Sequence, residues 1–230
     1  MMQRTPARVA YYESVIFLFR MLCLGLLKLR VSGREHLDVS GGALILSNHQ
    51  SMLDPVLAGC AIPRRVSFLA RQTLFRNRIF GWLCDYGGAI AIDRDGSGLG
   101  GLKETLKRLK SGEMILVFPE GTRSRDGNLT PLKGGFTVLA KRGNVPLIPM
   151  AIDGAHVSWP RGQKLPGVAT IQVVIGEPVP AEVVKTWSDE QLLAEMSQRI
   201  QVCLTEARAQ RLIRVQQTAP SNVSVTCDSG

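Results

Sequence analysis

Short apolar runs alternate along the chain with longer amphipathic or polar stretches. Ala43–Leu46, Val66–Ala70 and Met114–Val117 are rich in aliphatic residues, and such short runs between turn or polar residues are typical of buried strands. Leu102–Ser111 has helical periodicity and is followed by Gly112, which favours a helix that ends there. Because strands and helices alternate, the pattern predicts one α/β domain with a mixed central sheet flanked by helices.

Later parts of the chain continue this alternation. Further strands are predicted at Gly87–Arg94, Val145–Ile152 and Thr170–Ile175. Proline cannot donate to a strand ladder, so the two prolines of Val145–Ile152 predict an edge or entry strand. Ser188 and Gln191 have the spacing of a capping box at the start of a last amphipathic helix.

Residues 11–31 form the most apolar stretch of the chain, interrupted by Arg20, Lys28 and Arg30. A spanning helix needs about 20 predominantly apolar residues. On a helical wheel Glu13, Arg20 and Lys28 fall within about 80° of one another, which predicts a helix lying in the membrane interface. Two alternatives are a signal peptide, which would need an uninterrupted apolar core, and a helix packed on the domain itself. The predicted divisions are a membrane-associating helix at 1–31, a globular domain at 32–211 and a polar, disordered tail at 212–230.

The composition narrows the classes of partner. The 230 residues carry a formal net charge of +9 but only 6% aromatic residues, and no zinc-finger spacing occurs. This favours anionic lipids, coenzyme A or a membrane surface over nucleic acid. Five cysteines without a CxxC pair predict buried thiols in a reducing compartment. Only three histidines are present, so no metal site is predicted.

The stretch Ser47–Pro55 carries the first candidate chemistry. It follows a predicted strand, and Asp54-Pro55 is a helix-start signal in which the aspartate can cap and the proline suits the first helical position. His49 and Asp54 would lie about 140° apart on a regular helix, but on a loop they can pair. The carboxylate would then hold the imidazole in one tautomer. The alternative is an ordinary helix cap beside an unrelated histidine.

A second candidate stretch, Phe118–Ser124, follows the predicted strand Met114–Val117. Gly121 lets the backbone approach a ligand closely, and Arg123 adds a cationic donor. Arg94 follows another strand and offers a planar fork of donors that matches phosphate. The alternatives are a tight turn with an exposed Glu–Arg pair, and a surface pair between Asp93 and Arg94.

Taken together, these stretches occur in a specific order along the chain. The matching segments are Asn48-His49 with Asp54, Ile92–Arg94, Phe118–Ser124 and Val145–Pro149. In this order and spacing the chain resembles the glycerolipid acyltransferases, in particular those that act on 1-acylglycerol-3-phosphate, over about residues 30 to 180. It departs from the family at Arg71-Gln72-Thr73-Leu74, where a lysine-glutamate-leucine pattern is common.

The resemblance implies transfer of a fatty acyl group from acyl-CoA or acyl-carrier protein to the sn-2 hydroxyl of 1-acylglycerol-3-phosphate. The product would be phosphatidic acid, and no cofactor beyond the thioester donor is expected. The enzyme would work at the cytoplasmic face of a membrane. The resemblance also assigns residues that help to bind the phosphate end of the acceptor: Glu120, Gly121, Thr122 and Arg123, with Arg94 as a second cation. Because an anion does not attract phosphate, Glu120 is expected to orient Arg123 or a glycerol hydroxyl.

In this interpretation His49 is the general base for the acceptor hydroxyl and Asp54 orients it. A thioester is already activated and no Gly-x-Ser-x-Gly stretch occurs, so direct transfer is expected, with Ser51 as a loop hydrogen-bonder. Two other functions stay open. One is an acyltransferase for another lysophospholipid or a lyso-ornithine lipid, and the other is a non-catalytic lipid-binding membrane protein.

Overall fold

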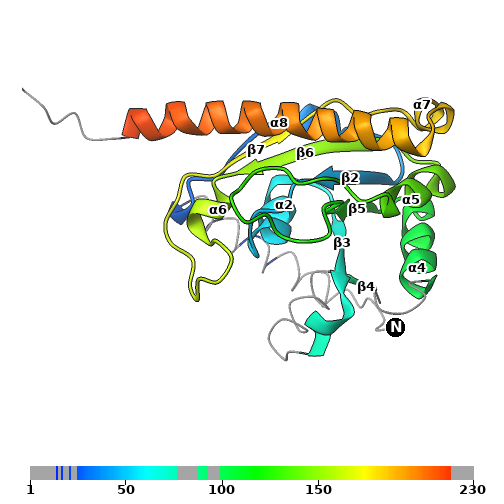
Figure 1. The fold of residues 1–230 in the computed structure, drawn as a ribbon, viewed down its shortest axis with the longest axis horizontal. Coiled ribbons are helices and arrows are strands. Elements are labelled where there is room, and N and C mark those ends of the chain that lie inside the picture. Colours follow the sequence, from blue (N-terminus) through cyan, green and yellow to red (C-terminus); the bar gives the residue numbers. More distant parts are fainter. Residues whose placement is uncertain are drawn as a thin grey trace, which may run out of the picture.

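A central sheet with helices on both faces dominates the computed structural model (Figure 1). The structure describes residues 25–76, 88–92 and 99–218, together with Ser14, Phe17 and Met21. The strand order is β1-β7-β6-β2-β5-β3-β4. The strands are β1 (Arg30–Ser32), β2 (Ala43–Ser47), β3 (Val66–Arg71), β4 (Ile90–Ile92), β5 (Met114–Val117), β6 (Leu147–Asp153) and β7 (Gln172–Ile175).

Neighbouring strands are parallel except for the antiparallel pair β6 and β7. The sheet is therefore mixed, which confirms the predicted α/β fold class. The helical elements are η1 (Arg34–Leu37), α2 (Asp54–Ala61), η2 (Gln72–Arg76), α4 (Leu99–Lys110), α5 (Gly135–Gly143), α6 (Ala155–Ser158), α7 (Ala181–Thr186) and α8 (Asp189–Thr218).

The two faces of the sheet bury separate apolar clusters. Helix α2 packs on one face, where Leu57 and Ala58 meet Ile45, Leu116 and Ile148 of three neighbouring strands. Helices α4, α5, α7 and α8 cover the other face. Because consecutive side chains of a strand point to opposite faces, a strand buried on both sides is an unbroken aliphatic run, as β2 and β5 are.

The prediction that Val145–Ile152 forms an edge strand is wrong. Strand β6 lies between β2 and β7, and each of its residues is buried. A proline is tolerated at position 149 because it faces the residue just beyond the end of β7. Its carbonyl accepts the N–H of Gly176 there (2.8 Å). The paired register with β7 starts one residue later, at Met150, so the missing proline N–H falls outside that ladder.

The start of helix α8 agrees with the prediction from the sequence, but its end does not. Its start has the predicted capping box, with Ser188 N–H donating to the Gln191 side chain (2.8 Å) and Gln191 N–H donating to the Ser188 hydroxyl (3.1 Å). Its end lies at Thr218, so residues 212–218 are helical rather than part of the predicted tail.

Most of the predicted membrane-associating helix at 1–31 lies outside the described residues, and its predicted end is wrong because Arg30 and Val31 belong to strand β1, which pairs with β7. Ser14, Phe17, Met21, Gly25 and Leu26 are helical and exposed. Among the described helices, none combines the length and apolar character needed to cross a bilayer. Asp93 and Arg94 also lie outside the described residues. Of the cysteines that are described, Cys60 and Cys203 are buried thiols.

Candidate active site

The candidate site lies where the parallel strands β2, β3 and β5 end. Their carboxyl ends meet at one edge of the sheet, which is where open α/β sheets bind ligands. The His49 loop leaves β2, η2 follows β3, and the segment 118–134 leaves β5. A cavity of about 720 Å³ opens between them, and His49 lines it.

The predicted pairing of His49 and Asp54 is confirmed. The Nδ1 atom of His49 lies 2.8 Å from Oδ2 of Asp54, whose side chain is fully buried, whereas that of His49 is 19% exposed. A carboxylate accepts, so Nδ1 carries the proton of this hydrogen bond and Nε2 is left as the basic ring nitrogen. The geometry therefore selects the tautomer that a general base requires.

Asp54 does not cap helix α2, contrary to the prediction. It is the first helical residue, Leu53 takes the capping position, and no side chain caps the helix. Instead, Oδ2 of Asp54 also accepts the backbone N–H groups of Gln50 (2.6 Å) and Ser51 (2.7 Å). The carboxylate is thus turned back into the loop, where it fixes the backbone of the two residues that follow His49. The other oxygen, Oδ1, is buried and has no hydrogen-bond partner among the described residues.

Polar side chains next to His49 fasten its loop to β6 and to later loops. The Asn48 amide bridges both backbone groups of Ile152, donating to the carbonyl (2.9 Å) and accepting from the N–H (2.8 Å). Gln50 donates to the carbonyl of Gly127 (2.6 Å). This bridging role of Asn48 has no signal in the sequence beyond a polar residue at a strand end.

Ser51 is a loop hydrogen-bonder, as predicted. It is fully buried, and its hydroxyl donates to the carbonyl of Trp159 (2.9 Å). A hydroxyl whose proton is already given to a backbone carbonyl is not aligned for activation by an imidazole.

Glu120 lies behind the cavity wall rather than in it. Its side chain is only 2% exposed; Oε1 accepts the N–H of His49 (2.6 Å), and Oε2 accepts the N–H (2.9 Å) and the hydroxyl of Thr130. Burial raises the pKa of Glu120 from its ordinary value of 4.5, and the hydrogen bonds from Thr130 and His49 partly offset that rise. Both carboxylate oxygens of Glu120 are therefore engaged by the backbone of His49 and by Thr130, and its contact with the acceptor stays a prediction. Thr130 was missed because two loop residues that meet only in the fold leave no spacing signal.

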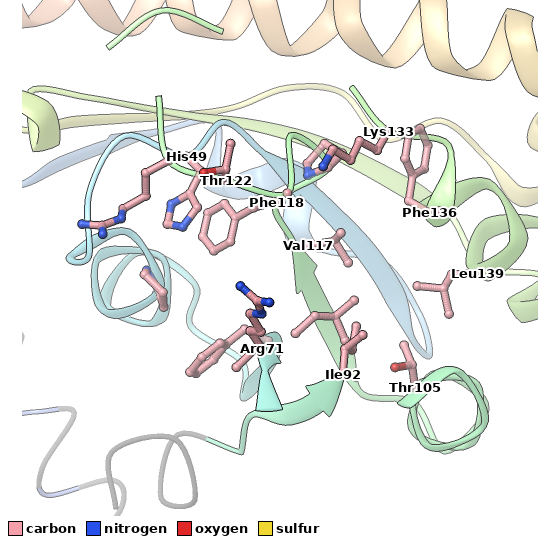
Figure 2. A pocket seen from close by; sticks show the side chains of 18 of the residues that line it. His49, Arg71, Ile92, Thr105, Val117, Phe118, Thr122, Lys133, Phe136 and Leu139 are labelled. Atoms are coloured by element: carbon pink, nitrogen blue, oxygen red, sulfur yellow. The ribbon is translucent and has the colours of Figure 1, made fainter. Parts of the chain in front are cut away.

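Cationic and polar side chains gather at the His49 end of the cavity. Gly121, Thr122 and Arg123 line it, as expected, and so do Arg71 and Lys133. In Figure 2 the side chains of Arg71 and Lys133 enter the cavity from opposite walls. Gly121 has a φ of +72°, and a Cβ placed there would lie 3.2–3.4 Å from the Lys133 side chain, so glycine leaves room for the lysine. Arg71 keeps a cation where the sequence departs from the family pattern.

The opposite end of the cavity is apolar. Figure 2 shows Val117, Ile92, Phe136 and Leu139 gathered away from His49. These side chains come from β5, β4 and α5. A single cavity therefore offers charge at one end and aliphatic walls at the other, which suits an amphiphilic ligand.

The ring of Phe118 stacks on the imidazole of His49, with centroids 4.2 Å apart and planes inclined by 18°. The negative face of an aromatic ring attracts a positive charge. Phe118 therefore holds the orientation of the imidazole and also stabilises its protonated form.

An oriented imidazole beside a cavity for amphiphilic molecules is typical of enzymes that transfer groups between lipids. A family model described as acyltransferase matches residues 28–153, which is more than half of the chain, so the chain belongs to the acyltransferase family.

Similar proteins carry one recurring name. The chain is 31% identical over 185 residues to the 1-acyl-sn-glycerol-3-phosphate acyltransferase of Bacillus subtilis, covering 80% of this chain and 85% of that protein. It is 35% identical over 174 residues to the enzyme of that name from Pseudomonas aeruginosa, covering 73% and 64%. The chain spans about half the length of the plant relatives it matches. Among solved structures, the crystal structure of the 1-acyl-sn-glycerophosphate acyltransferase PlsC from Thermotoga maritima matches with a TM-score of 0.76 at 26% identity, covering 91% of this chain and 84% of that one.

Proposed function

We propose that this protein transfers a fatty acyl group from acyl-CoA or acyl-carrier protein to the sn-2 hydroxyl of 1-acylglycerol-3-phosphate, forming phosphatidic acid. One observation carries the proposal. The His49–Asp54 pair, with Nδ1 and Oδ2 at 2.8 Å, adjoins a cavity that is cationic at one end and aliphatic at the other. The names of the relatives support the same reaction.

In this mechanism Nε2 of His49 takes the proton of the acceptor hydroxyl as its oxygen attacks the thioester carbonyl carbon. The new C–O bond forms, the C–S bond breaks, and the thiolate leaves with the proton returned by the imidazolium. Asp54 holds Nδ1–H and stabilises the positive ring in between. General base catalysis of this kind contributes about 10²–10⁴ in rate. Because the donor is activated, no covalent acyl-enzyme is needed.

The phosphate of the acceptor would lie among Arg123, Lys133 and Arg71, which all line the cavity. Arginine offers a planar fork for phosphate oxygens, and lysine offers a compact charge. The hydroxyl of Thr122 adds an uncharged donor on the same wall, whereas the N–H of Gly121 donates to the carbonyl of Phe118 (3.0 Å). Arg94 remains a predicted further cation, and Glu120 serves this site by holding the His49 backbone.

The N-terminal segment is proposed to lie in the membrane interface on the cytoplasmic side. Phe17, Met21 and Leu26 are helical with 62%, 46% and 51% of their surface exposed. Phe17 and Met21 are four residues apart, so they share one side of a helix. Two large apolar side chains exposed on the same helix side, Phe17 and Met21, favour insertion at the acyl boundary of a bilayer.

A test of the acceptor compares 1-acylglycerol-3-phosphate with 1-acylglycerol, which lacks the phosphate, by following release of free thiol. Arg123→Ala is expected to lower kcat/KM for the phosphate-bearing acceptor roughly 10–100-fold, because a hydrogen bond to a charged group is lost. The phosphate-free acceptor should be almost unaffected. Arg125→Ala is the matched control, since Arg125 is exposed and does not line the cavity.

Two outcomes would contradict the proposal. Equal losses with both acceptors would remove Arg123 from the phosphate site. Tight binding of lipid vesicles without thiol release from any acceptor would indicate a lipid-binding protein rather than an enzyme, and turnover of only another lysolipid would change the acceptor.

A further inference from the structure

The loop of residues 159–168, which follows α6, exposes aliphatic side chains to an unusual degree. Leu165 and Val168 are each 74% exposed, and Val157 in α6 just before the loop is 62% exposed. Single exposed aliphatic residues are common on protein surfaces. Here the exposed aliphatic residues lie close together in one short segment, and such clustering marks interaction surfaces.

The same loop is cationic. Arg161 and Lys164 are exposed, and the whole stretch from residue 154 to residue 176 contains no aspartate or glutamate. Exposed aliphatic side chains flanked by cations match the boundary between anionic headgroups and acyl chains. The negative surface potential of the headgroups attracts each basic residue.

The loop is also held in shape before any partner arrives. Ser158 and Gly167 close its base, with the Ser158 hydroxyl donating to the Gly167 carbonyl (2.6 Å) and the Gly167 N–H donating to the Ser158 carbonyl (2.7 Å). The indole N–H of Trp159 donates to the carbonyl of Gln163 (2.8 Å). A preformed loop loses little conformational entropy when it inserts, so its exposed area converts efficiently into binding.

The position of the loop links it to the cavity. Its first residue, Trp159, accepts the hydroxyl of Ser51 from the His49 loop (2.9 Å). In Figure 1 the loop, drawn in yellow beyond α6, projects from the sheet on the side opposite α8. A surface that engages the loop would therefore lie next to the site rather than against the C-terminal helix.

We propose that the 159–168 loop is a second membrane contact, separate from the N-terminal segment. Leu165 and Val168 insert among the acyl chains of an anionic bilayer, and Arg161 and Lys164 lie at its headgroups. The inference extends the proposed function, which supplies the reason for the chain to meet a bilayer. The aliphatic tips favour a lipid surface over an acidic soluble protein as the occupant.

The test measures partitioning of the full chain onto vesicles by co-sedimentation. The vesicles contain either phosphatidylcholine alone or equal parts phosphatidylcholine and phosphatidylglycerol. The double variant Leu165→Ser/Val168→Ser should lower the partition coefficient on the mixed vesicles roughly tenfold, because it removes buried aliphatic groups. Arg161→Gln/Lys164→Gln should lower it on the mixed vesicles only. Val202→Ser is the matched control, being 59% exposed but on α8, and should change nothing.

Hydrogen exchange gives a readout that does not depend on activity. The backbone amides of residues 160–168 should exchange more slowly when the mixed vesicles are added, and those of residues 205–215 should not. Thermal unfolding of each variant in solution confirms that it folds.

Unchanged partitioning of both double variants, with no slowing of exchange in the loop, would overturn the proposal. Slowing by an acidic soluble carrier protein but not by vesicles would overturn it as well. Failure of the proposed function can be told apart from failure of the loop proposal, because the unaltered chain would then release no thiol. A short-chain acceptor dissolved without vesicles should be turned over normally by Leu165→Ser/Val168→Ser.

Discussion

Two buried carboxylates reach the same histidine and act on different parts of it. Asp54 binds the ring through Nδ1 (2.8 Å), whereas Glu120 binds the backbone N–H (2.6 Å). Among the described residues, Asp54 leaves one oxygen without a hydrogen-bond partner, while both oxygens of Glu120 are occupied. A carboxylate on the ring can respond to the charge that appears there during reaction. One on the backbone can only fix where the ring sits, so we expect Asp54 to govern rate and Glu120 to govern stability and position.

The largest effect is expected from removing the imidazole that the two carboxylates serve. His49→Ala should lower the rate of thiol release about 10³-fold, because the general base is lost. The fold should persist, since the ring lines a cavity and stacks on Phe118 rather than filling the core. Far-UV circular dichroism and the Tm provide the control. Near-normal turnover by the folded variant would refute the role of His49.

The next largest effect concerns the ring-binding carboxylate. Asp54→Asn keeps the side-chain volume but removes the charge that stabilises the protonated imidazole, so kcat should fall roughly 10²-fold. The value of KM should stay nearly unchanged, because Asp54 does not line the cavity. Steady-state kinetics with a saturating thioester separate the two constants. A change confined to KM would contradict the comparison.

The backbone-binding carboxylate should show its effect mainly in stability. In Glu120→Gln an amide group must face the donors of Thr130 or His49, which need acceptors. We expect a loss of about 1–3 kcal/mol in the free energy of unfolding, with a smaller loss of kcat than in Asp54→Asn. Urea denaturation measures the first quantity. A variant as stable as the parent but inactive would reverse the assignment of the two carboxylates.

Comparison of the parent protein with Glu120→Gln also gives a prediction on the pH dependence of stability. Burial raises the pKa of Glu120 above 4.5 in the folded protein, so the folded state holds this proton more tightly than the unfolded state. The contribution to stability is fully present below pH 4.5 and is lost as the pH rises through the raised pKa. The stability of the parent relative to Glu120→Gln should therefore fall over that window and then level off. A rise over the same window would mean that the hydrogen bonds outweigh burial.

The smallest effect is expected at Ser51, whose hydroxyl bonds to neither His49 nor Asp54. Ser51→Ala removes a hydrogen bond to Trp159 and should cost about 1 kcal/mol of stability with less than about a tenfold change in rate. Complete loss of turnover, together with an ester trapped on Ser51 in the parent, would replace direct transfer by an acyl-enzyme mechanism.

Local signals in the sequence were enough for each described strand except β1, whose Arg30 and Val31 lie in the stretch predicted as a helix. Runs such as Ala43–Leu46 are buried on both faces, so their composition alone marks them. The loop allowed His49 and Asp54 to pair, and the resemblance to the acyltransferases favoured that pairing over an ordinary helix cap. The part of the cavity lining that carries the cations was predicted in part, through Arg123 and Gly121.

What could not be predicted depends on partners distant in the chain. The place of β6 at the centre of the sheet depends on where β7 ends beside Pro149. The task of Glu120 depends on Thr130, which a separate turn brings to it. The extra length of α8 depends on Arg214, which donates to the carbonyl of Lys28 and to the side chain of Gln172 (3.0 Å). In each case the local composition is compatible with several outcomes, and a tertiary contact selects one.

Helix α8 is the last described element to be translated, yet it covers strands made long before it. Cys203, Leu204 and Ala207 close over Ala151 and Val174, and Arg211 forms an ion pair with Asp153 at the end of β6 (2.5 Å). Until these residues leave the ribosome, the nascent chain carries an uncovered aliphatic sheet, which is the kind of surface that aggregates or recruits chaperones. A stop codon inside this helix should therefore yield an insoluble product rather than a shortened enzyme.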